Sequence, residues 1–299
     1  AAAPILDTSI STVFCDVIGR SLNDYTSTTP PDGTVLTWST LSDPLNENAY
    51  LSAAQVANPP NDGSYFGFFL DNNGTPNNFN DDCASGVIEV ELTLNTTPEV
   101  PIGTGNERCG PGTVLLTAST ASAGASLNWY NSPDSDTPVG TGTNFTTPPI
   151  SATTSFYVEA IENTCATERV EVVATVGFQA SAGTPSNASI CSIAENGPTI
   201  LDLDDRLNGE GVGTWAITTD PSGSITIGPS NIIDFRNLPA GDYVFTFTTT
   251  GSTAPCENVS SEVTISVSDC DTDEDGDGLF GGDEATLGTD PNNADTDGD

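Results

Sequence analysis

The chain has 299 residues, and its 42 acidic residues against five basic ones give a formal net charge of −37 at pH 7. Such a charge repels nucleic-acid backbones and anionic membrane surfaces, and no run approaches the roughly 20 apolar residues that cross a bilayer. Histidine and lysine, the commonest general bases and amine nucleophiles, are absent. We therefore expect no nucleic-acid partner, no direct membrane insertion and no enzyme activity.

A cysteine, a tryptophan and a second cysteine follow one another in this order three times. Each second cysteine precedes a run of alternating apolar and polar residues, and this period of two indicates a half-buried β-strand. A chain of this length suits three modules of about 80 to 100 residues and a tail. The three sets are Cys15, Trp38 and Cys83; Cys109, Trp129 and Cys165; and Cys191, Trp215 and Cys256.

The first module is predicted at residues 1–98, with an alternating strand at 87–94. It contains the densest aromatic stretch of the chain, Tyr65-Phe-Gly-Phe-Phe69. Aromatic faces stack on sugar rings, so one hypothesis makes this module a carbohydrate-binding module. The alternation within the stretch favours a buried core strand instead.

The second module is predicted at residues 106–178 and divides most clearly into strands. Short strands separated by turns, one tryptophan and no helical periodicity are typical of an immunoglobulin-like β-sandwich. The predicted fold class is therefore all-β, with three tandem immunoglobulin-like sandwiches. The strands expected in this module lie at 113–117, 126–130, 155–160 and 169–176.

The third module is predicted at residues 187–268, and its alternating strand lies at 262–267. Two linkers are predicted between the modules, at 97–105 and 179–187. Both contain proline together with glycine, which predicts limited hinging.

The cysteine spacing argues against a metal site, because no two cysteines form a Cys-x-x-Cys pair and no histidine completes a set. Seven cysteines favour disulfides and an oxidising, extracellular compartment. A bond within one module would close a loop of about 60 residues and contribute about 4 kcal/mol. The predicted disulfides join Cys15 to Cys83, Cys109 to Cys165, and Cys191 to Cys256.

Cys270 has no partner in this scheme. Three alternatives stay open for it: a cysteine beyond Asp299, a cysteine of another chain, or Cys191 in place of Cys256.

Residues 269–299 form an acidic tail without a basic residue, and its first part fits the twelve-residue calcium loop. Such a loop supplies carboxylates at positions 1, 3 and 5, a carbonyl at position 7 and a bidentate acid at position 12. The next residues are predicted to form a helical turn that ends at Gly288. A disordered acidic tail is the alternative. The predicted Ca²⁺ ligands are Asp273, Asp275, Asp277, Leu279 and Glu284.

A second loop begins 22 residues after the first, with three acids at the same spacing. We expect Asp295, Asp297 and Asp299 to bind a second calcium ion. The sequence stops before the second glycine of this loop, so we expect a longer parent protein.

Three pieces of the tail form a familiar pattern: Asp273 to Leu279, Asp283-Glu284, and Leu287-Gly-Thr-Asp-Pro291. They resemble the thrombospondin type 3 calcium repeat in its bacterial form. The resemblance covers only the tail, and it implies calcium as the ligand.

The second module carries Arg108-Cys-Gly-Pro-Gly-Thr-Val114, Leu127-Asn-Trp-Tyr130 and Ile150-Ser-Ala-Thr-Thr-Ser-Phe-Tyr-Val-Glu159. These residues resemble the immunoglobulin-like modules of very large surface proteins that gliding Bacteroidota export by the type IX route. The third module is similar to companion modules through Gly213-Thr-Trp215. The resemblance implies arrays that form extended stalks, filaments or adhesins at the cell surface.

Together these features indicate a non-catalytic stalk segment of a large secreted cell-surface adhesin, stiffened by disulfides and calcium. Its expected partners are calcium and either surface glycans or other copies of the adhesin. Two alternatives stay open: a spacer of a secreted polysaccharide-degrading enzyme, and a carbohydrate-binding module.

Overall fold

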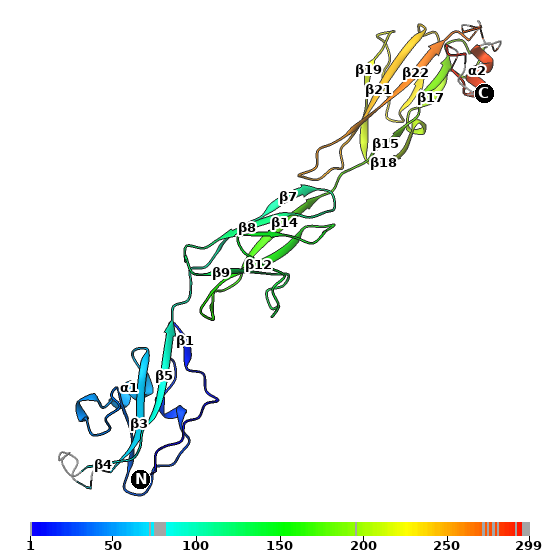
Figure 1. Cartoon of the computed structure of the whole chain (residues 1–299). Coiled ribbons are helices and arrows are strands. Elements are labelled where there is room, and N and C mark those ends of the chain that lie inside the picture. Colours follow the sequence, from blue (N-terminus) through cyan, green and yellow to red (C-terminus); the bar gives the residue numbers. More distant parts are fainter. Residues whose placement is uncertain are drawn as a thin grey trace. The chain divides into compact units, whose positions relative to one another are not determined.

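Almost all regular secondary structure in the described part of the chain is β-strand, which confirms the all-β prediction (Figure 1). The computed structural model describes residues 2–71, 73–74, 82–194, 196–270, 273, 275–276, 279, 281–290 and 292–294. These residues form two compact units. The first unit comprises Ala1–Thr104, Leu116–Phe145 and Ser155–Val172, and the second comprises Gly105–Leu115, Thr146–Thr154 and Val173–Asp299.

The first five strands form one sheet, which we call the N-terminal group. Its order is β1-β5-β3-β2, with β4 paired to β3, and β1 runs parallel to β5. The strands are β1 (Val13–Cys15), β2 (Val35–Ser39), β3 (Gly63–Asp71), β4 (Cys83–Ala84) and β5 (Ile88–Asn95).

The N-terminal group differs from the predicted two-sheet sandwich, because all its described strands belong to one sheet. The second layer of its core comes from the 3-10 helix Leu22–Tyr25 and the helix α1 (Ala53–Ala57), whose Val56 packs against the buried cluster. A further 3-10 helix spans Glu47–Ala49. The connecting stretch 26–34 contains Pro30, Pro31 and Gly33, and such residues weaken strand ladders, so helical turns and loops cover this sheet.

Nine strands form the middle group, which consists of two sheets. The larger sheet has the order β10-β9-β12-β14-β7 with β13 paired to β12, and the smaller has the order β11-β8-β6. Trp129 of β9 is fully buried and stacks on Phe145 of β11 with ring centroids 5.2 Å apart, so the core lies between the sheets. The strands are β6 (Ile102–Thr104), β7 (Asn106–Cys109), β8 (Leu115–Ser119), β9 (Ser126–Tyr130), β10 (Gly140–Thr141), β11 (Asn144–Thr146), β12 (Thr154–Glu162), β13 (Cys165–Ala166) and β14 (Val170–Gly177).

The C-terminal group contains a four-stranded sheet, β16-β22-β21-β19, and two pairs, β15-β18 and β17-β20. Its strands are β15 (Ala182–Pro185), β16 (Ala188–Cys191), β17 (Ile200–Asp202), β18 (Leu207–Glu210), β19 (Gly213–Thr219), β20 (Ile232–Asp234), β21 (Gly241–Thr249) and β22 (Ser260–Ser268). A 3-10 helix spans Asp204–Arg206, and the helix α2 (Gly281–Leu287) follows in the tail.

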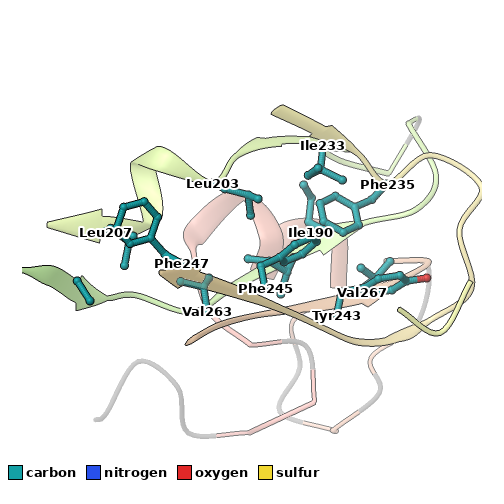
Figure 2. Packing of buried hydrophobic residues seen from close by; sticks show 12 residues of the cluster. Ile190, Leu203, Leu207, Ile233, Phe235, Tyr243, Phe245, Phe247, Val263 and Val267 are labelled. Carbon is teal, nitrogen blue, oxygen red and sulfur yellow. The ribbon is translucent and has the colours of Figure 1, made fainter. Parts of the chain in front are cut away.

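The core of the C-terminal group lies between its four-stranded sheet and the two strand pairs, as Figure 2 shows. Phe235 follows β20, and its ring meets the rings of Tyr243 and Phe245 of β21 edge-on, with centroids 5.5 and 6.3 Å apart. Leu203 and Phe245 are fully buried in the same cluster. Alternate residues of β21 therefore face this core, as the period of two requires.

Parts of both predicted linkers belong to sheets. Strand β6 lies in the stretch 97–105 and pairs with β8, and strand β15 lies in the stretch 179–187 and pairs with β18. Each strand is too short to produce a recognisable alternation in the sequence. The hinging predicted for these stretches stays a prediction, and it applies only to the few residues outside the two strands.

The indole of Trp38 lies directly over Gly67, its cross-strand partner in the β2–β3 pair. A Cβ atom added at Gly67 would stand 2.9 Å from two ring carbons of Trp38. We expect Gly67→Ala to lower the free energy of unfolding of the N-terminal group by about 1–3 kcal/mol through overpacking. Hydrogen exchange of β3 during denaturant titration measures this change.

Gly19→Ala is the matched control, because Gly19 lies in the same group and a Cβ atom there would meet nothing within 4 Å. Equal stability of the two variants would show that the contact between Trp38 and Gly67 is looser than the structure indicates.

Candidate functional site

Three cysteines each end a strand that runs parallel to the last strand of its group. Cys15 ends β1 opposite Asn95 of β5. In the same way, Cys109 ends β7 opposite Gly177 of β14, and Cys191 ends β16 opposite Ser268 of β22. We call Cys15, Cys109 and Cys191 the parallel-strand cysteines.

Three other cysteines each lie in the connection between the last two long strands of a group. Cys83 lies in β4 opposite Asp71 of β3, and Cys165 lies in β13 opposite Glu162 of β12. Cys256 lies between β21 and β22. We call Cys83, Cys165 and Cys256 the turn cysteines.

The predicted disulfide pairs are wrong, because the bonds join successive groups instead of closing within one. Cys15 is bonded to Cys165, and Cys109 is bonded to Cys256, so each parallel-strand cysteine joins the turn cysteine of the following group. Cys191 is bonded to Cys270, which was one of the alternatives open from the sequence. Cys83 is a free, exposed cysteine.

Strand geometry explains why a bond within one group cannot form. The β3–β5 register places Gly63 beside Leu92 at the end where Cys15 lies, whereas Cys83 lies opposite Asp71 at the other end of β3. The nine residues of β3 span roughly 27 Å at about 3.3 Å per residue. A disulfide needs Cα atoms within about 7 Å, so Cys15 and Cys83 are too far apart.

The other two groups repeat this geometry, because β12 and β21 also have nine residues. In the C-terminal group, Gly241 pairs with Val267 near Cys191, while Thr248 pairs with Ser260 at the opposite end, where Cys256 lies. Each group therefore carries a parallel-strand cysteine at one end and a turn cysteine at the other.

Hydrogen bonds surround the Cys15–Cys165 bond. The Asn95 side-chain amide donates to the Asn163 carbonyl at 3.1 Å, and Thr97 donates to the Asp16 carboxylate from its amide and its hydroxyl, at 2.9 and 2.6 Å. Cys165 is fully buried although it lies in a turn. The Cys165 sulfur also lies 3.9 Å from the Phe14 carbonyl oxygen of β1, so β1 lies beside this cysteine.

Around the Cys109–Cys256 bond the backbone of the connecting segment is also engaged. The Phe178 amide donates to the Thr253 hydroxyl at 2.8 Å, and the Thr253 amide donates to the Phe178 carbonyl at 2.9 Å. The Gln179 side chain donates to the Glu257 carbonyl at 2.9 Å. Both connections thus combine a covalent bond with hydrogen bonds to the segment beside it.

The predicted calcium loop is described in part. The Asp273 carboxylate accepts the Gly276 amide at 2.8 Å, and Glu284 of α2 has a side chain that is 0% exposed. Among the described residues no three His, Cys, Asp or Glu side chains gather closely enough for a metal site. Of the predicted ligands, Asp277, Asp295, Asp297 and Asp299 lie outside the described residues.

The residues that follow the loop behave as the sequence predicts. Helix α2 ends before Gly288, whose φ of +82° places it in the left-handed region. The Gly288 amide donates to the Glu284 carbonyl at 2.8 Å, as in a glycine C-cap. A buried carboxylate needs a cation or hydrogen-bond donors around it, so the burial of Glu284 suits the acid that closes a calcium loop.

The tail is attached to the C-terminal group by three kinds of contact. Besides the Cys191–Cys270 bond, the Asn196 side chain donates to the Asp269 carbonyl at 2.7 Å. Helix α2 also packs against β16. The parallel strand that holds Cys191 therefore positions the start of the acidic tail.

A buried polar cluster in the middle group offers no free catalytic group. Glu159 accepts hydrogen bonds from the Tyr130 hydroxyl at 2.5 Å and from Arg169 Nε at 3.0 Å. Arg169 also lies over the Tyr130 ring, 3.5 Å from its centroid. Burial, followed by the hydrogen bond to Glu159, raises the pKa of Tyr130. The cluster fixes the packing of β9, β12 and the strand start at Arg169.

The aromatic stretch in β3 is part of the core. Tyr65, Phe68 and Phe69 are all buried, so their faces are covered by protein. This burial confirms the core-strand interpretation of the stretch.

Residues 97–177 match the family model described as an Ig-like domain, CHU_C associated. No curated protein matches the chain. No helix in the described residues has the length and hydropathy needed to cross a membrane.

Solved structures resemble the chain distantly. The mouse nectin-like molecule 4 ectodomain (Ig1–Ig3) is 14% identical, with 86% of this chain and 97% of that chain covered and a TM-score of 0.33. The insect immune protein hemolin is 12% identical, with 89% and 77% covered and a TM-score of 0.26. A Ca²⁺-stabilized adhesin of an Antarctic bacterium is 11% identical, with 80% and 66% covered and a TM-score of 0.30.

Trypsin distinguishes the two disulfide patterns, because it cleaves this lysine-free chain only after its five arginines. Without reduction, we expect fragment 21–108, which carries Cys83 alone, to be released. Fragments 1–20, 109–169, 170–206 and 237–299 should stay together through the three bonds. Mass spectrometry measures both products.

The internal check is maleimide labelling of the folded chain, which should modify one thiol, on fragment 21–108. Recovery of 21–108 bonded to 1–20 would instead establish the pairing of Cys15 with Cys83.

Proposed function

We propose that the chain is a non-catalytic stalk segment of a secreted bacterial cell-surface adhesin, with three tandem modules and a calcium-binding tail. The observation that carries this proposal is the pair of disulfides joining successive groups. The Ig-like match over residues 97–177 supports the module type. Three disulfides support an oxidising, extracellular location.

The disulfides provide a short covalent path for tension between the two ends. From Cys15 the path crosses to Cys165, continues to Cys191 and crosses to Cys270. The bonded cysteines are 150 and 79 residues apart in the sequence, and the residues between them are largely left off this path. Only about 70 residues lie on the path, so most of the chain carries no tension when its two ends are pulled apart.

Single-molecule force spectroscopy tests this arrangement. The oxidised chain should extend to about 250 Å at full unfolding, because about 70 residues at roughly 3.5 Å each lie on the path. The reduced chain should extend to about 1,000 Å, since all its residues then lie on the path. An oxidised chain that extends as far as the reduced one would rule out the stalk mechanism.

A matched pair of variants separates the effect of losing one disulfide from any other effect of the reducing agent. Cys165→Ser removes the longest bypass, so we expect a gain in extension without reductant. Cys83→Ser removes a free thiol of the same kind and should leave the oxidised extension unchanged.

Calcium is the second part of the proposal. Asp273, Asp275 and Glu284 carry oxygen ligands of the kind that calcium prefers, and Glu284 is fully buried. We propose that these residues, with Asp277 and the Leu279 carbonyl, bind one Ca²⁺. Asp295, Asp297 and Asp299 would begin a second site. A bound ion would neutralise the repulsion between acids held in a small volume.

Calorimetric titration of the full chain with calcium tests the first site. We expect a Kd of about 10⁻⁴ to 10⁻³ M, the range of extracellular sites. Glu284→Gln should weaken binding at least about tenfold, because it removes the bidentate ligand and its charge. The control is Asp283→Asn, an exposed neighbour in α2 whose loss of charge should change the Kd far less.

If both substitutions weakened calcium binding equally, the tail would bind calcium through its overall negative charge and not through a defined loop. If no heat of binding were measured at millimolar calcium, the tail would be better described as a disordered acidic segment.

The adhesive partner follows from the same proposal. Surface glycans and other copies of the adhesin are the proposed partners, and export by the type IX route in a gliding bacterium is the proposed pathway. A glycan array probed with the full chain, with and without calcium, tests the first of these partners.

A further inference from the structure

Cys83 occupies the same position in the N-terminal group as Cys165 does in the middle group. Asp71 pairs with Cys83 and Leu70 with Ala84, just as Glu162 pairs with Cys165 and Ile161 with Ala166. Strands β3 and β12 both have nine residues, and their patterns of burial agree at every position after the first.

The hydrogen bonds next to the two cysteines agree as well. Two residues after Cys83, the Ser85 hydroxyl accepts the Phe69 amide at 3.0 Å and donates to the next carbonyl, that of Gly86. Two residues after Cys165, the Thr167 hydroxyl accepts the Ala160 amide at 3.0 Å and donates to the carbonyl of Glu168. The residues that follow the two cysteines therefore make the same hydrogen bonds to the neighbouring long strand and to the next carbonyl.

The equivalent cysteines of the other two groups are both bonded. Cys165 joins Cys15, and Cys256 joins Cys109, each of them the parallel-strand cysteine of the preceding group. Both turn cysteines are buried, whereas Cys83 is exposed. The thiol at the equivalent place in the N-terminal group is therefore accessible to solvent.

The partner of Cys83 cannot come from residues 1–299 without the loss of another bond, because the other six cysteines are paired. In a second copy the other six cysteines are paired as well, and its one free cysteine, Cys83, is a turn cysteine, whereas the two bonds between groups each join a turn cysteine to a parallel-strand cysteine. The pattern of the other two bonds therefore calls for the parallel-strand cysteine of a further group, one that is not already bonded to a turn cysteine.

We propose that Cys83 forms a disulfide with the parallel-strand cysteine of a further sandwich-type module outside residues 1–299, which covers this end of the N-terminal group. The inference goes beyond the proposed stalk function and does not rest on calcium binding. It extends the rule followed by the Cys15–Cys165 and Cys109–Cys256 bonds by one module.

The chemistry is thiol–disulfide exchange. The two thiols lose two protons and two electrons as the sulfur–sulfur bond forms. The oxidant is the disulfide of a thiol-oxidising carrier protein, which takes up the electrons and protons and becomes a dithiol.

A non-reducing tryptic map of the protein isolated from the cells that make it tests this proposal, with free thiols blocked by N-ethylmaleimide at lysis. We expect fragment 21–108 to be bonded to a peptide from outside residues 1–299, whose cysteine ends a strand of alternating residues. The cluster of fragments 1–20, 109–169, 170–206 and 237–299 serves as the internal control that native bonds survived.

Three results would overturn the assignment. They are N-ethylmaleimide on Cys83, a small thiol such as glutathione on Cys83, and a bond between Cys83 and any cysteine of a second copy. None of these results affects the stalk proposal, because that proposal rests on the bonds within residues 1–299.

Discussion

The position of one short parallel strand in each group determines how the whole chain is connected. Strands β1, β7 and β16 each run beside the last strand of their group and end in a cysteine. The turn cysteine of the same group lies a nine-residue strand away, at the opposite end. Because disulfide geometry forbids a bond over that distance, these two cysteines do not bond within their own group, and the bonds that form reach the following group or the tail.

The sequence contained enough information for the strands but too little for their connections. Alternation reveals strands such as β14 and β22, because each buries one face along its whole length. Parallel pairing of β1 with β5 joins residues about 80 apart, and nothing local records it. The order of cysteines along the chain therefore could not show which end of a sheet each one occupies. The pairs β6–β8 and β15–β18 were missed because three or four residues are too few to show a period.

The sequence likewise specified the acids of the candidate calcium loop better than the partners of the cysteines. Spacing alone selected Asp273 and Glu284, since a calcium loop requires acids at fixed intervals, and calcium binding by these residues stays a prediction. The partner of Cys270 was one of three alternatives, because a choice among them needs the end of β16 in space. The special position of Cys83 depends on the register of β3 with β4, which the sequence does not record.

The loops closed by the three disulfides overlap along the chain, from 15 to 165, from 109 to 256 and from 191 to 270. A single break in the backbone at any peptide bond between Cys15 and Cys270 therefore leaves both pieces joined by at least one disulfide. Separate loops within each group would leave the connecting segments open to severance by one protease. A protein exposed outside the cell could thus be nicked once at a surface turn and still remain one covalent molecule.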